Sequence, residues 1–264
     1  MGGGSPGSGT FKDHFSGHAG SYATGRPVYP PALVDALAER CERTELALDC
    51  GCGNGQLSTL LAARFGRVVA TDASAAQVAQ ALPHARVEYR VARGEDSGLP
   101  DHCADLVVAA QAVHWFDQPA FFREVRRVAR PGALCALVTY HLILIEPAID
   151  RFIHHFHDVV LKDHWPPERA SVIAGYRDID LPFPEVALPP LEIVVEWQLA
   201  DLFNYVDTWS AVKLAEKQLA ESPQLAFRRG IAPLWGDPAL RRVVRWPLTA
   251  RCGRVVPAAR VPQR

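Results

Sequence analysis

"LALDCGCGNGQLSTLLAARF", residues 46–65, places three glycines at alternate positions between two apolar runs. These are Gly51, Gly53 and Gly55, and Asp49 stands just before them. A glycine inside a regular element costs about 0.5–1 kcal/mol relative to alanine, so three together indicate a special requirement. They predict a tight turn from a strand into a helix, or a place where a ligand comes closer to the backbone than a Cβ atom allows.

Strand-like and helix-like segments alternate on both sides of this turn. The expected strands are residues 45–50, 67–72, 86–92, 104–111 and 132–140. Repeated strand–helix–strand units give right-handed crossovers and a mostly parallel sheet with helices on both faces. Ligands of such sheets bind beyond the carboxyl ends of the strands, which is the edge where the glycine turn lies.

The chain after residue 140 has a different pattern. We expect a helix over 148–165, a proline-rich loop over 166–190, a strand over 191–200, helices from about 201 to 235, and a last strand over 241–255. The expected organisation is one domain preceded by a flexible tail. Its parts are a tail (1–10), an N-terminal lid segment (11–30), a cofactor-binding core (31–140), a lid or substrate insertion (141–190) and C-terminal strands and helices (191–264).

Bulk properties argue against several classes of function. The 264 residues carry 28 basic and 29 acidic side chains, so no overall field attracts nucleic acid or an anionic membrane. No run approaches the roughly 18 apolar residues of a membrane span, and the first ten residues lack the apolar core of a signal peptide. The six cysteines have no disulfide-scaffold spacing. We therefore expect a cytoplasmic protein with reduced thiols, no nucleic-acid or membrane partner, and a monomeric or homodimeric state.

The details of the turn predict its ligand. The stretch has no Gly-Lys-Ser/Thr for a nucleoside triphosphate, and Gln56 stands where a dinucleotide turn has its third glycine. An acid beside the turn, Asp49, suits a ligand with an ammonium or sulfonium group. Asp72 ends the next strand, where a carboxylate can accept both hydroxyls of a ribose. Together these features predict an adenosine-containing cofactor.

The chain resembles the class I S-adenosylmethionine-dependent methyltransferases. "LALDCGCGNGQLS" is similar to the first motif of that family and "VVATDAS" to the second. "VARGEDSGLP" resembles the segment that borders adenine, and "DLVVAAQAVHWFD" the fourth strand with its active-site edge. "DHFSGHAGSYATGRPVYPPALVDAL" and "WPLTARCGRV" resemble the small-molecule branch that includes trans-aconitate methyltransferases. The resemblance implies an α/β, Rossmann-like sheet of seven strands in the order 3-2-1-4-5-7-6, the last antiparallel, with a helical lid.

The resemblance also implies roles for individual residues. The methionine part of S-adenosylmethionine would meet Asp49, Gly51, Cys52 and Gly53, and the ribose would meet Asp72, with Ala73 beside the adenine. Gly94 and Glu95 would lie at the adenine edge, and Gln111 near the amino group. The cofactor carboxylate or an acidic substrate would meet Tyr22 and Arg26 of the N-terminal lid. The candidate catalytic set consists of His114 as base or substrate anchor, Trp115 and Tyr140 as pocket walls, and Arg26.

Other interpretations of the same residues stay open. The glycines can serve a tight turn alone, Asp72 can cap the following helix, Glu95 can be a solvated loop carboxylate, and His114 and Trp115 can be packing residues. His154, His157 and Asp158 suggest a metal only weakly, because no partner motif accompanies them, and we expect no metal. A nicotinamide-dependent oxidoreductase, a nucleic-acid methyltransferase and a cofactor-binding sensor without activity are the alternative functions. The leading expectation is methyl transfer to a small molecule, with a carboxylate as one option.

Overall fold

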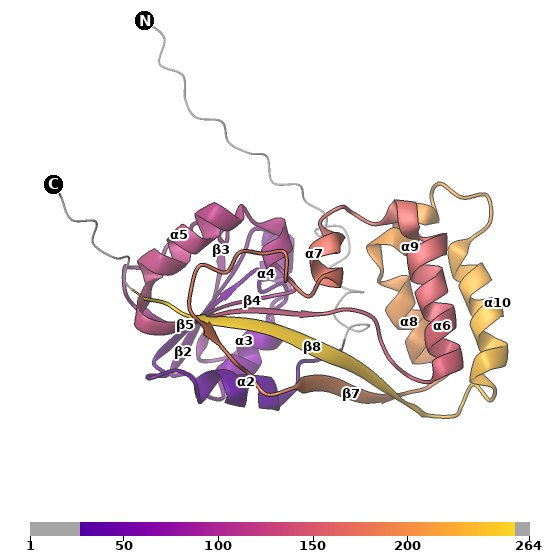
Figure 1. The fold of residues 1–264 in the computed structure, drawn as a ribbon, viewed down its shortest axis with the longest axis horizontal. Helices are drawn as coiled ribbons and strands as arrows, with labels where there is room; N and C mark the ends of the chain where they lie inside the picture. Colours follow the sequence, from indigo (N-terminus) through magenta and orange to yellow (C-terminus); the bar gives the residue numbers. More distant parts are fainter. Residues whose placement is uncertain (1–26, 257–264) are drawn as a thin grey trace, which may run out of the picture.

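The computed structural model describes residues 27–256, in which eight strands form a single sheet beside a group of helices (Figure 1). The strands are β1 (Leu46–Cys50), β2 (Arg67–Asp72), β3 (Val87–Val91), β4 (Ala104–Ala110), β5 (Ala129–Tyr140), β6 (Glu185–Val186), β7 (Leu191–Trp197) and β8 (Arg242–Arg254).

The sheet has the order β3-β2-β1-β4-β5-β8, with β6 and β7 both paired to β8. The first five strands are parallel, and β8 is antiparallel to the strands that it pairs with. The predicted order with an antiparallel last strand is confirmed. The predicted number of seven strands is wrong by one, because the two-residue β6 pairs with Cys252 and Gly253 inside the proline-rich segment that was expected to be a loop.

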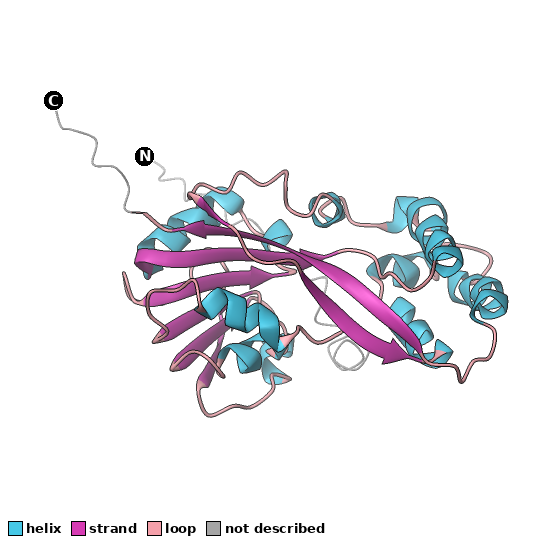
Figure 2. Cartoon of the chain, turned by 60° about the horizontal axis from the view of Figure 1, so that its bottom comes forward, coloured by secondary structure: helices cyan, strands magenta, loops and turns pink. Residues whose placement is uncertain are grey.

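The central strands are buried on both faces because their side chains alternate between two apolar layers. Ala47 of β1 and Leu134 of β5 belong to one cluster, whereas Leu48 and Cys135, the next residues along each strand, belong to the other. Helices lie on both sides of the sheet (Figure 2). This double burial explains why β1, β4 and β5 are almost continuously apolar in sequence.

The helices of the first half begin at clear start signals. Ser74 and Asp117 each accept a hydrogen bond from a first-turn backbone N–H, and Pro31 occupies the first position of its helix. The helices of this half are α2 (Pro31–Ala38), α3 (Gln56–Leu61), α4 (Ala75–Ala79) and α5 (Gln118–Val128), with the 3₁₀ turn η1 (Val113–Trp115) after β4.

The second half builds a helical cap beside the carboxyl end of the sheet (Figure 1). Its elements are α6 (Pro147–His155), the π-helix η2 (Phe156–Val160), the 3₁₀ turn η3 (Lys162–His164), α7 (Arg169–Ile173), α8 (Leu199–Asp207), α9 (Ser210–Ala215) and α10 (Pro223–Trp235). The strands β7 and β8 run from the sheet to this cap. One apolar cluster joins cap residues such as Phe156 and Trp235 to residues of α2, α3 and the sheet.

The expected single helix over 148–165 is wrong. The chain forms α6, widens into the π-helix η2 and then tightens into η3 before Pro166 and Pro167. Phe156 and His157 both pack against Trp209, and Trp165 donates from its indole nitrogen to the carbonyl of His157 at 3.0 Å. These tertiary contacts outweigh the regular helical bonding of a short segment.

Candidate active site

The three glycines form a left-handed turn between β1 and α3. The φ angles of Gly51, Gly53 and Gly55 are 71°, 56° and 84°, a region that other residues adopt only at a cost. The backbone N–H groups of Gly51 and Cys52 donate to the carbonyl of Thr71, at 2.7 and 3.0 Å, and so fasten the turn to the end of β2. A tight turn is therefore part of the reason for the glycines.

The surroundings of the glycines differ. A Cβ atom on Gly51 would lie 2.5 Å from the Ala112 Cβ, and one on Gly55 would lie 2.2 Å from the Tyr89 hydroxyl oxygen. A Cβ atom on Gly53 would meet only Gln77 Oε1, at 3.9 Å. Gly51 and Gly55 thus allow close packing within the protein, whereas the α-carbon of Gly53 faces a space where a ligand can approach.

Asp49 is a buried carboxylic acid at the start of the turn. Its residue is 1 % exposed, and Ser58 donates a hydrogen bond of 2.6 Å to its Oδ2. Burial raises the pKa of Asp49 to about 7, the bond from Ser58 opposes this rise, and the nearby Asp72 adds to it. A cationic group would favour the ionised form of Asp49, so the site fits a ligand with an ammonium group.

Asp72 connects the end of β2 to the same turn. Its Oδ2 accepts from the Gly53 N–H at 2.9 Å and its Oδ1 accepts from the Ser74 N–H at 2.8 Å. Because Ser74 caps α4, Asp72 also orders the start of that helix, as one of the alternative interpretations held. A carboxylate offers about four acceptor positions, so it can serve more partners than these two N–H groups. The chemistry of Asp72 is compatible with binding ribose hydroxyls.

The side chains around Cys52 and Ala73 define the chemistry of this edge. The thiol of Cys52 has a pKa well above its usual value because of burial and because of the carboxylates Asp49 and Asp72. It therefore stays a thiol and is no nucleophile. Ala73 follows Asp72 directly and is half-buried, so its small side chain lies at the predicted adenine side of the turn.

The segment after β3 carries the predicted residues Gly94 and Glu95. Glu95 accepts from the backbone N–H of Asp117 at 2.8 Å and so ties this segment to the start of α5. The ring of Phe116 would lie 2.7 Å from a Cβ atom on Gly94, and it also lies against Gly51. Phe116 therefore separates the two backbone segments that are predicted to hold the cofactor, a role that the sequence did not reveal.

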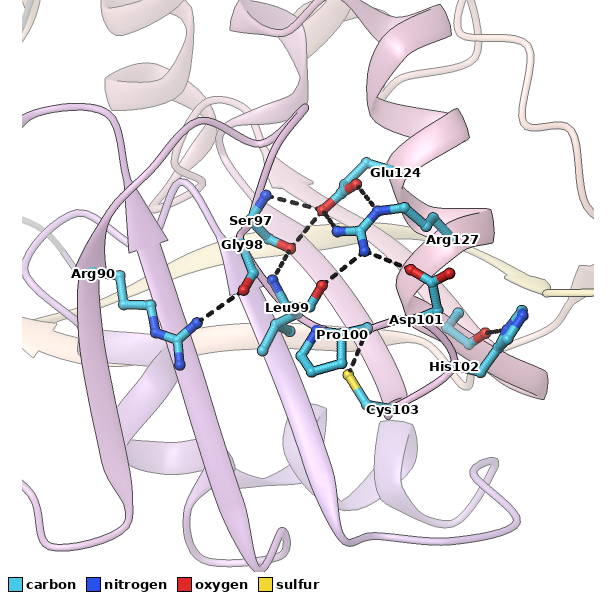
Figure 3. A network of polar contacts seen from close by, with 11 residues as sticks. Arg90, Ser97, Gly98, Leu99, Pro100, Asp101, His102, Cys103, Glu124 and Arg127 are labelled. Carbon is cyan, nitrogen blue, oxygen red and sulfur yellow. Dashed lines mark hydrogen bonds and ion pairs between the residues drawn. The ribbon is translucent and has the colours of Figure 1, made fainter.

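An ion pair between a buried carboxylate and a half-exposed arginine holds the rest of this segment. Glu124 of α5 accepts from the backbone N–H and the hydroxyl of Ser97, at 2.9 and 2.6 Å, and pairs with Arg127 (Figure 3). Arg127 also donates to the carbonyl of Leu99 and to Asp101, both at 2.7 Å. The predicted adenine side of the site is thus fixed by side chains of α5.

Gln111 and Tyr140 lie together at the carboxyl ends of β4 and β5. Gln111 has a φ of 53°, its Nε2 donates to the carbonyl of Tyr140 at 2.8 Å, and its Oε1 accepts from the Thr139 hydroxyl at 3.0 Å. The ring of Tyr140 is buried and contacts Tyr29 edge-on at a centroid distance of 6.1 Å. The carboxamide of Gln111 is thus oriented by β5.

His114 and Trp115 form the next part of the edge, in η1. His114 Nδ1 lies 2.9 Å from the hydroxyl of Tyr176, which is fully buried behind α7. The imidazole also contacts the Trp115 ring at a centroid distance of 4.9 Å. The lid segment thus reaches the predicted catalytic histidine through Tyr176. No sequence pattern indicates this contact, because the two residues are separated by 62 positions.

Two imidazoles of the cap lie near the same edge. His141 follows Tyr140 directly, and its ring contacts that of His157 at a centroid distance of 5.2 Å. Burial lowers the pKa of both, that of His141 to about 3, and the guanidinium of Arg169 lowers them further. His157 Nδ1 lies 2.6 Å from Asp158 Oδ1, while His157 Nε2 and His141 Nδ1 are buried and have no hydrogen-bond partner among residues 27–256. Neutral imidazoles with unmet hydrogen-bonding capacity suit a polar ligand.

The remaining predicted features lie outside this edge of the sheet or outside the described residues. Tyr22 and Arg26, together with the tail and most of the N-terminal lid, lie outside the described residues. Within 27–256 no group of three His, Cys, Asp or Glu side chains is placed to hold a metal ion. No helix of that part is both long and apolar enough to cross a bilayer. A cavity of about 500 Å³ between residues 27–31, β7 and α8 is lined by none of the predicted site residues.

Comparisons with known proteins agree with this geometry. The family model of the methyltransferase domain matches residues 48–137, from the glycine turn through β5. A candidate methyltransferase of Dictyostelium discoideum is 31 % identical over 204 residues, which are 76 % of this chain and 78 % of that protein. A candidate S-adenosylmethionine-dependent methyltransferase of Mycobacterium tuberculosis is 36 % identical over 151 residues, 56 % of this chain and 54 % of that protein.

The fold comparison extends beyond the core. The solved structure of a candidate type II methyltransferase from Anaeromyxobacter dehalogenans is 45 % identical, with a TM-score of 0.84. The match covers 88 % of this chain and 99 % of that one. It therefore includes the cap as well as the sheet.

Proposed function

The chain belongs to the class I S-adenosylmethionine-dependent methyltransferases, and from that premise we propose that it methylates a small molecule that carries an acidic group. The observation that carries the proposal is the arrangement of side chains at the carboxyl ends of the parallel strands. The glycine turn, Asp49 and Asp72 form its cofactor side, and Tyr176 of the lid contacts His114 on its acceptor side.

The chain's own groups suit S-adenosylmethionine. The cofactor supplies an electrophilic methyl group on a sulfonium. In this proposal Asp49 binds the ammonium of its methionine part and Asp72 binds its ribose, while the open side of Gly53 allows close approach. Gly94, Glu95 and Phe116 are proposed to border the adenine, and the bond from the Asp117 N–H to Glu95 supports this by ordering the segment. Since a neutral thioether leaves, the protein needs no general acid, and its main tasks are alignment and exclusion of water.

The acidic group of the acceptor is proposed from the charges of the lid. Arg169 stacks on Trp165 at 4.9 Å, and next to burial its positive charge contributes to the low pKa values of His141 and His157. A carboxylate near Arg169 could accept a hydrogen bond from the neutral imidazole of His141 as well, whereas His157, whose Nδ1–H donates to Asp158, offers only an acceptor at Nε2. An anchored acid of this kind would place the remainder of a small molecule beside His114.

A thermal melt with S-adenosylhomocysteine tests the cofactor part, with NADH as the control. Ligand at a hundred times its Kd adds about 2.7 kcal/mol, which raises the melting temperature of a domain of this size by several degrees. We expect a shift with S-adenosylhomocysteine and none with NADH. A shift with NADH alone would contradict the cofactor assignment.

Turnover of small acids tests the acceptor part. S-adenosylhomocysteine release is measured over a set of mono-, di- and tricarboxylic acids, first with the natural chain and then with Arg169→Gln. We expect Arg169→Gln to raise KM at least about tenfold, because removing one partner of a charged contact typically costs 2–5 kcal/mol. Arg177→Gln, an exposed arginine of the same lid, is the matched control. Cofactor binding without turnover of any acid would favour the sensor alternative.

A further inference from the structure

A buried imidazole and a surface carboxylate stand next to each other in the π-helix η2. The side chain of His157 is 1 % exposed and that of Asp158 is 56 % exposed. His157 Nδ1 lies 2.6 Å from Asp158 Oδ1. An ionised carboxylate can only accept a hydrogen bond, so the proton of this contact belongs to Nδ1. The surface group thereby fixes which nitrogen of the buried ring carries a proton.

The other nitrogen of this imidazole is an unused acceptor. His157 Nε2 is buried, and no residue of 27–256 forms a hydrogen bond with it. Burial lowers the pKa of His157, and although the bond to Asp158 opposes this, the pKa lies below its usual value and the ring is neutral at pH 7. With its proton on Nδ1, the neutral ring has a lone pair on Nε2. Buried polar atoms of native proteins nearly always have a partner, so this atom points to a ligand.

The neighbouring side chains hold the imidazole in one orientation. Trp165 lies against it at a centroid distance of 4.5 Å, and Trp209 contacts it edge-on at 5.6 Å. The indole nitrogen of Trp165 also donates to the carbonyl of His157 at 3.0 Å. A single π-helical turn of this kind is frequent at functional sites. The ring is therefore held with Nε2 unpaired instead of turning toward a partner within the protein.

This imidazole lies beside the groups already proposed to bind the methyl acceptor. His141, whose ring contacts that of His157 at 5.2 Å, directly follows Tyr140 at the carboxyl end of β5. Arg169, the proposed anchor of the acidic group, stacks on Trp165 at 4.9 Å. Arg169 and His157 thus contact the same indole ring, so a small molecule held by one is close to the other.

We propose that His157 Nε2 accepts a hydrogen bond from a hydroxyl group of the methyl acceptor, and that Asp158 is the positioning residue that keeps the lone pair on Nε2. The inference rests on the proposed function, because the acidic group near Arg169 brings the hydroxyl to the imidazole. It narrows the acceptor class to hydroxy acids, in which an ionised carboxylate and a neutral hydroxyl belong to one small molecule.

The lone pair on Nε2 discriminates between polar groups. A carboxylate has no proton to donate and is repelled by the lone pair. An ammonium group could donate, but the burial and the Arg169 charge that lower the pKa of His157 disfavour another positive charge at the same place. A hydroxyl donates one proton and carries no charge. Of these three groups the hydroxyl therefore suits the atom best.

Pairs of acids that differ by one hydroxyl group test the proposal. Lactate and propionate, malate and succinate, and citrate and tricarballylate are titrated into the chain saturated with S-adenosylhomocysteine, and calorimetry gives each Kd. In at least one pair we expect the hydroxy acid to bind about 5- to 150-fold more tightly, because the other acid leaves a buried acceptor without a partner.

Variants separate the hydroxyl contact from the acid anchor. His157→Phe keeps an aromatic ring in place and should remove the preference by weakening the hydroxy acid alone. Asp158→Ala, at an exposed position, should reduce the preference, whereas Arg169→Gln should weaken both acids of the pair. His155→Phe and Asp163→Ala change exposed residues of the same segment, and as matched controls they should leave both affinities unchanged.

The protonated nitrogen of His157 can be measured without cofactor or acid. The chain is labelled with ¹⁵N-histidine, and His157→Phe identifies the signal of this ring. We expect a neutral ring with its proton on Nδ1 in the natural chain, and a mixture of both tautomers in Asp158→Ala. A proton on Nε2 in the natural chain would overturn the inference even if His157→Phe failed to fold.

The titrations distinguish failure of this inference from failure of the proposed function. Equal affinity for both acids of every pair, or a preference that persists in His157→Phe, overturns the inference and leaves the acid anchor in place. Binding of no acid by the natural chain refutes the proposed acceptor class and this inference with it. Failure to bind S-adenosylhomocysteine in the same samples would refute the cofactor assignment.

Discussion

Gly51 and Gly53 share a left-handed backbone conformation but have different surroundings. Substitution of each by alanine, which adds one methyl group, therefore tests their roles separately. Alanine at either position meets the cost of a positive φ, about 1–3 kcal/mol. At Gly51 the added Cβ also meets Ala112 at 2.5 Å, and overpacking costs about 1–3 kcal/mol more. At Gly53 it enters the space assigned to the cofactor.

We predict that Gly51→Ala is the less stable of the two variants. Gly53→Ala should lose less stability but should bind the cofactor product more weakly. Urea unfolding should show Gly51→Ala to be about 2–6 kcal/mol less stable than the natural chain and Gly53→Ala about 1–3 kcal/mol less stable. Calorimetry should show that Gly53→Ala, although folded, binds S-adenosylhomocysteine at least about tenfold more weakly. Unchanged affinity in Gly53→Ala would contradict the assignment of that space.

Asp49 should make both stability and cofactor binding depend on pH. Its folded pKa of about 7 lies above the ordinary value of an aspartate, so its contribution to stability is fully present below about pH 4 and is lost as the pH rises through 7. Asp49→Asn removes the ionisable group. We predict that its stability relative to the natural chain rises by about 1–3 kcal/mol between pH 5 and pH 8, because the slope of about 1.36 kcal/mol per pH unit applies only up to the folded pKa.

Cofactor affinity should change with pH in the direction opposite to stability. Since the ionised carboxylate is the partner of the ammonium group, S-adenosylhomocysteine should bind the natural chain more tightly at pH 8 than at pH 6, and Asp49→Asn should lose this dependence. Ser58→Ala removes the bond that lowers the pKa of Asp49, so it should move the midpoint of the natural dependence to higher pH. Urea titrations and calorimetry at several pH values give both quantities, and a flat profile for the natural chain would contradict the assignment.

At the scale of elements, α5 stabilises the segment after β3 through one buried carboxylate. Although burial by itself raises the pKa of Glu124, bonds from Arg127 and Ser97 more than offset it, and the pKa lies below its usual value. We predict that Glu124→Gln lowers the free energy of unfolding by about 2–4 kcal/mol, because it leaves Arg127 and the Ser97 N–H poorly paired. The contribution of Glu124 should also be lost as the pH falls through its folded pKa.

A surface pair is the matched control for this element. Glu88 of β3 pairs with Arg67 and Arg90, but its side chain is 43 % exposed against 6 % for Glu124. Glu88→Gln should therefore cost less than about 1 kcal/mol. Urea unfolding of both variants at pH 7 measures the difference. Equal losses would show that burial of Glu124 does not determine its contribution.

The strands and the cofactor turn could be predicted from the sequence because their signals are local. Strands that are buried on both faces of the sheet consist of nearly continuous apolar residues, which can be recognised in the sequence. The glycines indicate a backbone with positive φ, which only glycine adopts without strain. Asp49 and Asp72 follow from the ends of adjacent strands, since parallel strands bring their carboxyl ends to one edge. The start of β5 was placed three residues late, at Gly132 instead of Ala129, because Pro131 and Gly132 are typical of turns.

The acceptor side could not be predicted in this way. Tyr176 lies in a segment rich in prolines, and its contact with His114 depends on how the lid packs on the sheet. His157 was placed on a regular helix, but the π-helix and the packing of Trp165 and Trp209 turn it toward His141. Such contacts arise from tertiary packing between segments that are far apart in the chain. Local residue patterns do not predict which of these segments meet.

At the scale of the whole molecule, the cap and the sheet share one apolar core. The cluster that contains Leu33, Leu61 and Leu134 also contains Trp209 and Trp246 of the cap and of β8. Trp246 is fully buried, and its indole nitrogen donates to the Tyr205 hydroxyl of α8 at 3.2 Å. Because neither part can expose this cluster alone without losing burial in the other, we predict that cap and sheet unfold in one cooperative transition.

Tryptophan fluorescence and cysteine labelling can follow the unfolding of the cap and of the sheet separately. Five of the six tryptophans (Trp165, Trp197, Trp209, Trp235 and Trp246) lie in the cap or in β7 and β8, so fluorescence follows the cap. The buried thiols of Cys50 and Cys135 follow the sheet and are measured by pulse labelling in urea. The two transitions should coincide, and Trp246→Ala should lower both together by about 3–5 kcal/mol. A fluorescence transition at lower urea than the thiol transition would show instead that the cap opens by itself, and closure of the lid over the substrate would then be a separate equilibrium.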